Sequence, residues 1–281
     1  MLKLNLVDKE KSDISYDISR FPDGEVQITL GEFSRKSEVN VRCRITTADE
    51  LFILTQVCDI LARHDVQFSV SIYYLMGMRM DRVMDFNRPF TLKVIVGILD
   101  NLGAADVSLF CPHSERSLDL FKKTDAYNIC SEEWESFNNS LTGYQTVLPD
   151  AGAVDRYYYA EPPADVIIGE KVRDVATGKI LSIKVKNPEA LDGRPLLLID
   201  DLCDGGGTFV GLASAIREIK PDAKISIVVN HMVNPKGIEN LSKNFDHVWF
   251  SNSYKNWRGF KAEYGKVVPT LPENVTQIEV I

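Results

Sequence analysis

From Thr47 onward, short apolar runs alternate with longer segments of helical periodicity. Residues 48–65 have apolar side chains at helical spacing after Thr47, a suitable N-cap, and residues 91–103 form a second helical segment that ends at Gly103. A third helix is expected over 207–220. The strand-like runs lie at 67–76, 106–110, 145–150, 164–169, 179–185, 194–200 and 224–230. Strands separated by helices in this way predict βαβ units and parallel sheets.

A polar, irregular stretch over 121–145 separates two halves that repeat this rhythm. A chain of 281 residues is also long enough for two domains, at roughly 150 residues each. We therefore expect an α/β protein with domains at 1–135 and 136–281, each a mainly parallel sheet flanked by helices. The final strand-like run, TQIEVI, is a candidate to return to the first domain. In such sheets ligands bind beyond the carboxyl ends of the strands.

Composition narrows the classes of function. The net charge is −8, which argues against broad electrostatic binding of nucleic acid. No run approaches 18 apolar residues, so no membrane span is expected, and the start becomes charged before a signal-peptide core could form. The five cysteines are scattered without CxxC spacing and indicate reduced thiols. We expect a cytoplasmic protein.

Residues 196–208, LLLIDDLCDGGGT, carry the most specific signal. A buried strand delivers Asp200 and Asp201 at its end, and three glycines and Thr208 then open the helix at 207. Glycines let backbone N–H groups approach a phosphate, and the helix dipole favours its charge. Adjacent carboxylates suit the vicinal hydroxyls of a ribose or a bridging divalent metal ion. A bare DD or GGG is typical of an ordinary turn, but the whole string between a strand and a helix predicts a sugar-phosphate site.

At these residues the sequence resembles the ribose-phosphate pyrophosphokinases (phosphoribosyl-pyrophosphate synthetases), which share this loop with type I phosphoribosyltransferases. Further segments resemble the synthetases in order and spacing, and the resemblance covers most of residues 15–255. These segments are FPDGEVQI (21–28), YLMGMRMDRVMDFNRP (74–89), LFCPHSERSLDLF (109–121), VLPDAGAVDR (147–156) and GEKVRD (169–174).

The resemblance implies two phosphoribosyltransferase-like domains and a role for each motif. It implies ATP binding by the first domain, through Phe21, Asp23, Glu25, Arg79, Asp81 and His113. It implies that Mg²⁺ is linked to His113 and Asp150. It implies that the ribose phosphate is bound by Asp200, Asp201, Asp204, Gly205, Gly206, Gly207 and Thr208. The catalytic pair it implies is Lys171 and Arg173.

These residue types suit diphosphoryl transfer, which needs positioning, Mg²⁺ and cations rather than covalent chemistry. Lys171 and Arg173 alternate after the 164–169 strand, so both can point at one ligand. On their own they would be typical of a solvated hairpin. The flanking Gly169 and Gly178 favour a lid that closes over the substrate.

The sequence also departs from the family pattern. The loop has Asp-Gly-Gly-Gly-Thr where synthetases typically have Asp-Thr-Ala-Gly-Thr, and Met80 replaces the usual glutamine before Asp81. The chain is shorter than typical members around residues 31–45, so the family's hexamer and allosteric control are not carried over. A homodimer or higher homo-oligomer is expected.

The departures leave two acceptors open. One is ribose 5-phosphate, converted to phosphoribosyl pyrophosphate. The other is ADP-ribose, which some virus-encoded relatives are understood to pyrophosphorylate for NAD rebuilding. An open glycine loop is compatible with this larger acceptor.

Two other classes compete with the kinase. A type I phosphoribosyltransferase would share the glycine loop but would not need the ATP segments. A non-catalytic, synthetase-like regulatory subunit should have lost the Lys-x-Arg pair or the acidic pair, and this chain keeps both.

Overall fold

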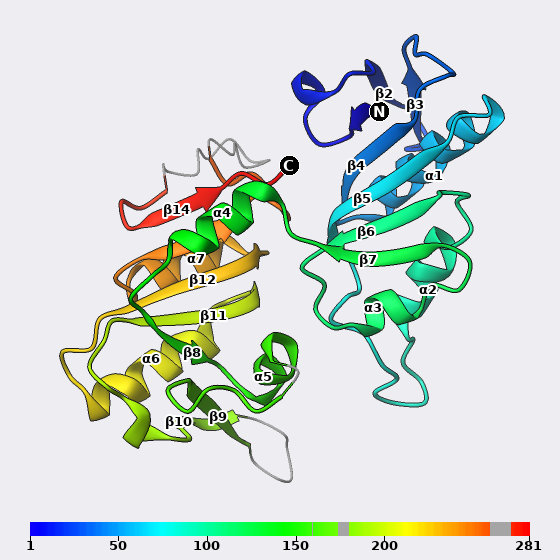
Figure 1. Ribbon diagram of the computed structural model, residues 1–281. Helices are drawn as coiled ribbons and strands as arrows, with labels where there is room; N and C mark the ends of the chain where they lie inside the picture. The colour runs from blue at the N-terminus through cyan, green and yellow to red at the C-terminus, as the bar shows by residue number, and fades with distance from the viewer. Residues whose placement is uncertain (159, 174–179, 259–270) are drawn as a thin grey trace. The chain divides into compact units, whose positions relative to one another are not determined.

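The computed structural model describes residues 1–158, 160–173, 180–258 and 271–281, with the backbone alone at 172, 173, 180 and 181. The chain divides into two compact units, Met1–Ser131 together with Ile281, and Glu132–Val280. The division lies within the polar 121–145 stretch. Each unit has a mainly parallel sheet with helices (Figure 1), so the predicted α/β architecture is confirmed. Across the described ranges, no helix is long and apolar enough to cross a lipid bilayer.

The first unit begins with a short strand and a 3₁₀ turn and then alternates strands with helices. Its elements are β1 (Leu2–Asn5), η1 (Lys9–Lys11), β2 (Tyr16–Arg20), β3 (Val26–Leu30), β4 (Val39–Ile45), α1 (Ala48–Arg63), β5 (Phe68–Leu75), α2 (Thr91–Leu99), β6 (Asp106–Phe110), α3 (Arg116–Asp119) and β7 (Asp125–Ile129).

Five parallel strands form the main sheet of this unit, in the order β1-β4-β5-β6-β7. Helix α1 begins where the sequence predicts it, because Thr47 and Glu50 form a capping box. The Glu50 N–H donates to Thr47 Oγ1 at 3.2 Å, and the Thr47 N–H donates to Glu50 Oε2 at 3.0 Å. Leu54 and Leu61 on this helix are fully buried in the core of the unit.

The hairpin β2–β3 is a separate two-stranded sheet held against α1. The side chain of Gln56 on α1 supplies both hydrogen bonds that a neighbouring strand would otherwise make. Its Nε2 donates to the Val26 carbonyl at 2.9 Å, and its Oε1 accepts from the Ile28 N–H at 3.1 Å. This amide satisfies part of the exposed edge of β3 and fixes the position of the hairpin.

The second unit starts with a helix and then builds its sheet. Its elements are α4 (Glu132–Ser140), β8 (Gln145–Leu148), α5 (Ala151–Tyr157), β9 (Ile167–Arg173), β10 (Ile180–Val185), η2 (Pro188–Ala190), β11 (Leu196–Cys203), α6 (Gly207–Ile219), β12 (Ile225–Met232), α7 (Pro235–Ser242), β13 (Val248–Ser251) and β14 (Val275–Ile278).

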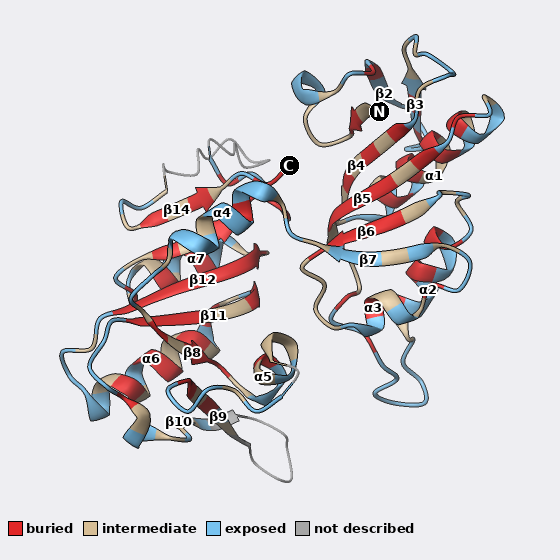
Figure 2. Cartoon of the chain, in the orientation of Figure 1, coloured by how far each residue is buried: buried red, intermediate tan, exposed pale blue. Residues whose placement is uncertain are grey.

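The described strands of this unit form one sheet in the order β10-β9-β8-β11-β12-β13-β14, antiparallel only at the β9–β10 pair. Every residue of β12 is buried, and Figure 2 shows buried residues concentrated on the inner strands. Such continuous apolar strands are typical of a parallel sheet covered on both faces. The last strand does not return to the first domain, the option raised from the sequence. β14 pairs in parallel with β13, and only Ile281 is grouped with the first unit.

Candidate functional site

Three neighbouring strands bring the predicted residues of the second unit to one edge of its sheet. β9, β8 and β11 lie side by side in parallel. Lys171 lies on β9 beyond its pairing with β8, Asp150 follows the end of β8, and Asp200 lies near the end of β11. The carboxyl edge of an α/β sheet is where ligands are expected.

Asp150 and Lys171 form a direct ion pair at this edge. Asp150 is the N-cap of α5, with its Oδ1 accepting from the Ala153 N–H at 3.1 Å, and its Oδ2 lies 2.5 Å from Lys171 Nζ. Burial alone would raise the pKa of Asp150. The hydrogen bond and the charge of Lys171 outweigh burial and hold this pKa below its ordinary value. The carboxylate is therefore ionised at neutral pH.

Asp200 and Asp201 share one arginine. Arg156 Nη1 lies 2.7 Å from Asp200 Oδ1 and 2.9 Å from Asp201 Oδ1. Burial and then the neighbouring charge of Asp201 raise the pKa of Asp200 to about 7, although Arg156 opposes both effects. The exposed fraction of the side chain is 17% for Asp200 and 3% for Asp201. Asp200 is thus the member of the pair that a ligand can reach.

The glycine loop between β11 and α6 contains one glycine that the fold requires and two that it does not. Gly206 is the N-cap of α6 with φ +75°, and a Cβ there would lie 3.2 Å from the side chain of Leu241. At Gly205 and Gly207 a Cβ would meet nothing within 4 Å. These two positions leave open space beside the helix N-terminus, where Thr208 occupies the first turn.

Helix α7 holds the other side of this loop. The Asn240 Nδ2 donates to the Gly205 carbonyl at 2.7 Å, and the Asn234 Nδ2 donates to Asp204 Oδ1 at 2.9 Å. Gly237 allows this contact, because a Cβ there would lie 2.2 Å from the Asp204 carbonyl oxygen. The backbone of the loop is therefore fixed from α7 without a ligand.

The segment predicted to be a lid is part of a β-hairpin where the structure describes it. Lys171 pairs with Ile183 of β10, and Arg173 is the last residue of β9. Gly169 lies inside β9, where a Cβ would stand 2.6 Å from the Pro149 carbonyl oxygen. Gly169 thus serves close packing. The side chain of Arg173 and all of Gly178 lie outside the described residues.

In the first unit, three of the predicted ATP-binding residues, Phe21, Asp23 and Glu25, lie at or beside the tip of the β2–β3 hairpin. The turn closes with the Phe21 N–H donating to the Glu25 carbonyl at 2.8 Å, and Gly24 supplies the required φ of +98°. Phe21 is 48% exposed and does not pack in the core. Asp23 and Glu25 are exposed beside it. The hairpin presents an aromatic ring and two carboxylates outward.

The other predicted ATP-binding residues of the first unit, Arg79, Asp81 and His113, lie on two segments that Asp81 joins. Asp81 is 4% exposed and accepts from Ser114 Oγ at 3.0 Å and Arg82 Nε at 3.1 Å. Burial would raise the pKa of Asp81, but these hydrogen bonds and the Arg82 charge lower it. The exposed Arg79 precedes this anchor in the chain, and the half-buried His113 adjoins it from the second segment. Asp81 therefore connects the segments that carry these two side chains.

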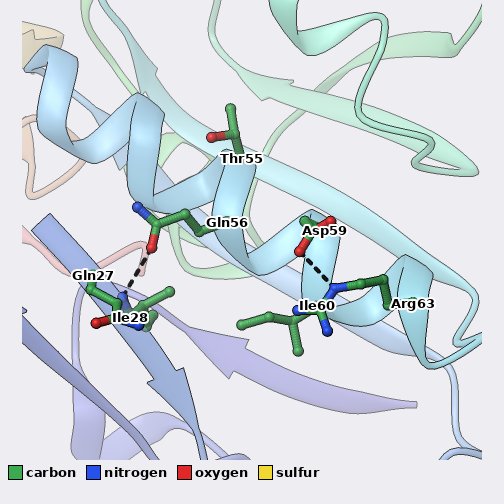
Figure 3. Close-up of a pocket in the computed structure, with 7 residues that line it drawn as sticks. All are labelled: Gln27, Ile28, Thr55, Gln56, Asp59, Ile60 and Arg63. Carbon is green, nitrogen blue, oxygen red and sulfur yellow. Dashed lines mark hydrogen bonds and ion pairs between the residues drawn. The ribbon is translucent and has the colours of Figure 1, made fainter.

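The two grooves described in the first unit lie away from its predicted ATP-binding residues. Two grooves of about 340 and 610 Å³ run between β3 and α1 and meet at Ile28 and Ile60. Figure 3 shows the first groove, with Gln56 bonded to Ile28 and Asp59 paired with Arg63. No predicted site residue lines either groove.

Several residues that support the site were not predicted. Arg156 stands in the segment VLPDAGAVDR, but its contact with Asp200 spans 44 residues, and local spacing does not reveal it. Ser114, Asn234 and Asn240 act through contacts over 30 or more residues, which sequence spacing does not reveal.

The acidic groups suit Mg²⁺ bound together with a phosphate substrate. Within the part of the chain that the structure describes, no three His, Cys, Asp or Glu side chains cluster as a metal site. Mg²⁺ commonly uses one or two carboxylates and completes its shell with water and substrate phosphates. The ionised Asp150 fits that mode.

Comparison with known proteins agrees with the sequence resemblance. No family model matches the chain. Ribose-phosphate pyrophosphokinase of Pyrococcus abyssi is 27% identical over 247 residues, covering 85% of this chain and 84% of the relative. The enzyme of that name from Helicobacter hepaticus is 25% identical over 249 residues, covering 84% and 78%.

A solved structure supplies the fold comparison. The phosphoribosylpyrophosphate synthetase of Mycobacterium smegmatis superposes with a TM-score of 0.72 over 97% of this chain and 88% of its own, at 17% identity. At that identity the likeness concerns the fold alone. The relatives in sequence confirm the predicted resemblance: over most of its length the chain is a homologue of proteins named ribose-phosphate pyrophosphokinase.

Proposed function

We propose that this protein transfers the β,γ-diphosphate of ATP to the anomeric 1-hydroxyl of ribose 5-phosphate and releases AMP. The observation that carries this proposal is the sheet edge of the second unit. There Lys171 on β9 pairs with Asp150, which follows β8, and β8 lies next to β11, the strand that carries Asp200 and leads into the glycine loop. One edge thus offers groups for a diphosphate, a ribose hydroxyl and a 5′-phosphate.

In the proposed reaction, the acceptor is oriented by the second unit. Asp200 accepts a ribose hydroxyl, and the N–H groups at the start of α6 with Thr208 bind the 5′-phosphate. The anomeric oxygen forms a bond to the β-phosphorus, the bond from that phosphorus to the α-phosphate oxygen breaks, and the hydroxyl proton passes to water. Lys171 and Arg173 stabilise the charge that develops on the transferred group.

We assign ATP binding to the first unit. Phe21, Asp23 and Glu25 are proposed to contact the adenine, and Arg79 and His113 the phosphates. Asp81 contributes by anchoring the two segments that carry Arg79 and His113, which is consistent with its burial. Mg²⁺, with Asp150 and His113 as the proposed metal-linked residues, would neutralise charge on the phosphate oxygens. We expect a homodimer or higher homo-oligomer.

The second candidate acceptor is ADP-ribose. The observation in its favour is the open space at Gly205 and Gly207. Neither glycine is required by a positive φ or by a close neighbour. The space is compatible with a group attached to the 5′-phosphate. The chemistry at the anomeric carbon would be the same.

The deciding experiment measures AMP release from Mg-ATP with ribose 5-phosphate and, separately, with ADP-ribose. A preference of about tenfold or more for ribose 5-phosphate supports the principal proposal, since tenfold corresponds to about 1.4 kcal/mol of transition-state binding. Preference for ADP-ribose assigns the loop to the larger acceptor. Absence of AMP release with both acceptors refutes the kinase proposal and favours a regulatory subunit.

A further inference from the structure

Arg156 occupies the place between Asp200 and Asp201 where a bridging cation would bind. Its Nη1 lies 2.7 and 2.9 Å from one oxygen of each carboxylate, and its side chain is only 17% exposed. Consecutive strand residues normally face opposite sides of a sheet, yet one nitrogen reaches both. Both carboxylates lie in the part of β11 beyond Leu198, where the pairing with β8 has stopped.

Two neighbouring carboxylates in a poorly hydrated place repel one another and need a positive partner. Proteins meet this need with a metal ion or with a fixed cation. Here the cation is covalently part of the chain and makes charge-assisted hydrogen bonds, which fix geometry as well as charge. A divalent ion bridging the pair would have to displace the guanidinium from two carboxylates.

The contacts also assign different tasks to the two carboxylates. The Arg156 Nη1 and the Asp201 N–H both donate to Oδ1 of Asp200. Asp200 keeps 17% of its side chain exposed, whereas Asp201 keeps 3%. Asp200 is therefore the carboxylate available to the acceptor, and the more deeply buried Asp201 serves as the second carboxylate that binds Arg156.

We infer that Arg156 is the positioning residue of the acceptor subsite: it fixes Asp200 to receive a ribose hydroxyl and excludes a bridging divalent metal ion from the acidic pair. The inference rests on the proposed function for the identity of the acceptor. The exclusion of metal does not depend on it.

The same short helix connects this arginine with the other half of the site. Asp150 caps the N-terminus of α5, and Arg156 lies in its last turn. Asp150 bonds Lys171, and Arg156 bonds the acidic pair. Helix α5 thus sets the spacing between the group proposed for the diphosphate and the group proposed for the acceptor.

The kinetic test compares the wild-type protein with Arg156→Ala and Arg156→Lys. We expect Arg156→Ala to raise the KM for the acceptor roughly tenfold or more, the effect typical of losing a charged hydrogen-bond partner, and to leave the KM for Mg-ATP nearly unchanged. Millimolar guanidinium should lower the acceptor KM of this variant again. Arg156→Lys should lie between the two, because an ammonium keeps the charge without the planar geometry.

Arg194→Ala is the matched control. Arg194 also bridges two aspartates of this unit, with Nη2 2.6 Å from both Asp165 and Asp192, but it lies outside the proposed site and its side chain is 42% exposed. It should leave both KM values and the guanidinium response unchanged. An acceptor KM in Arg156→Ala equal to that of Arg194→Ala, or equal rises in both KM values without guanidinium rescue, would overturn the positioning role.

The metal test needs no turnover. Titration of the nucleotide-free proteins with Mn²⁺, followed by electron paramagnetic resonance, should show one additional bound ion in Arg156→Ala, which Asp201→Asn in the same chain removes. Wild-type protein that already binds Mn²⁺ at a site sensitive to Asp201→Asn refutes the inference. If the wild-type protein releases no AMP with either acceptor, the proposed function fails, and this titration still decides the role of Arg156.

Discussion

The buried carboxylate of Asp200 should make the stability of the protein fall as pH rises through neutrality. Burial and the charge of Asp201 raise the pKa of Asp200 from its ordinary 3.8 to about 7 in the folded protein. The folded state therefore keeps a proton that the unfolded chain releases near pH 4. The stability from this proton is fully present below the unfolded pKa and is lost as pH rises through the folded pKa.

The size of the effect follows from the two pKa values. Between pH 5 and pH 8 the linkage amounts to about 2–3 kcal/mol of unfolding free energy. The groups that face Asp200 are Asp201, Arg156 and the buried thiol of Cys203. The proton belongs to the acidic pair as a coupled unit.

Chemical denaturation of the wild-type protein and of Asp200→Asn at pH 5 and pH 8 measures this linkage. Asparagine has the same shape and does not titrate, so it removes the proton exchange and preserves the packing. The stability of the wild-type protein relative to the variant should fall by about 2–3 kcal/mol from the lower to the higher pH. A constant difference would mean that Arg156 fully offsets burial, and a rising difference would reverse the sign; either result refutes the reasoning.

Three further outcomes can be measured directly. Lys171→Met should reduce kcat about 100-fold or more, with a small change in the KM for ATP, because Lys171 is assigned to the developing charge; steady-state kinetics would contradict this assignment if kcat were preserved. Gly206→Ala should lower the unfolding free energy by about 1–2 kcal/mol because its φ is +75°, whereas Gly207→Ala should raise it by about 0.5 kcal/mol and still impair the acceptor KM; thermal denaturation together with kinetics tests both. Asp81→Ala should raise the KM for ATP about tenfold and leave the acceptor KM unchanged, because a charged hydrogen-bond partner is lost; equal changes in both constants would argue against it.

The features predictable from the sequence are those that depend on neighbouring residues. Helix α1 follows from the N-cap Thr47 and its apolar spacing, and it runs from Ala48 to Arg63. The strand, the acidic pair and the glycines at 196–207 follow from local pattern in the same way. The order of motifs then led to the resemblance that the relatives confirm.

Features that depend on long-range contacts were missed. The β2–β3 hairpin is not among the predicted strands, and it is held by Gln56 about 30 residues later. The strand-like ending TQIEVI predicts a strand, but it does not reveal the strand with which this one pairs, which is β13. Arg156 meets Asp200 across 44 residues. In each case the missing information is which distant element lies alongside.

The glycine loop shows what the structure adds to a motif that the sequence already identifies. In the sequence, Gly205, Gly206 and Gly207 are equivalent, and each could serve a turn or a ligand. The positive φ and the contact with Leu241 show that the fold itself requires Gly206. Its two neighbours have ordinary φ values and open space where a Cβ would stand. An alanine at either neighbour would cost the fold nothing, so the absence of a side chain there is best explained by the group that binds beside the loop. Under the proposed function, we therefore expect substitutions at Gly205 and Gly207 to change the specificity for the acceptor.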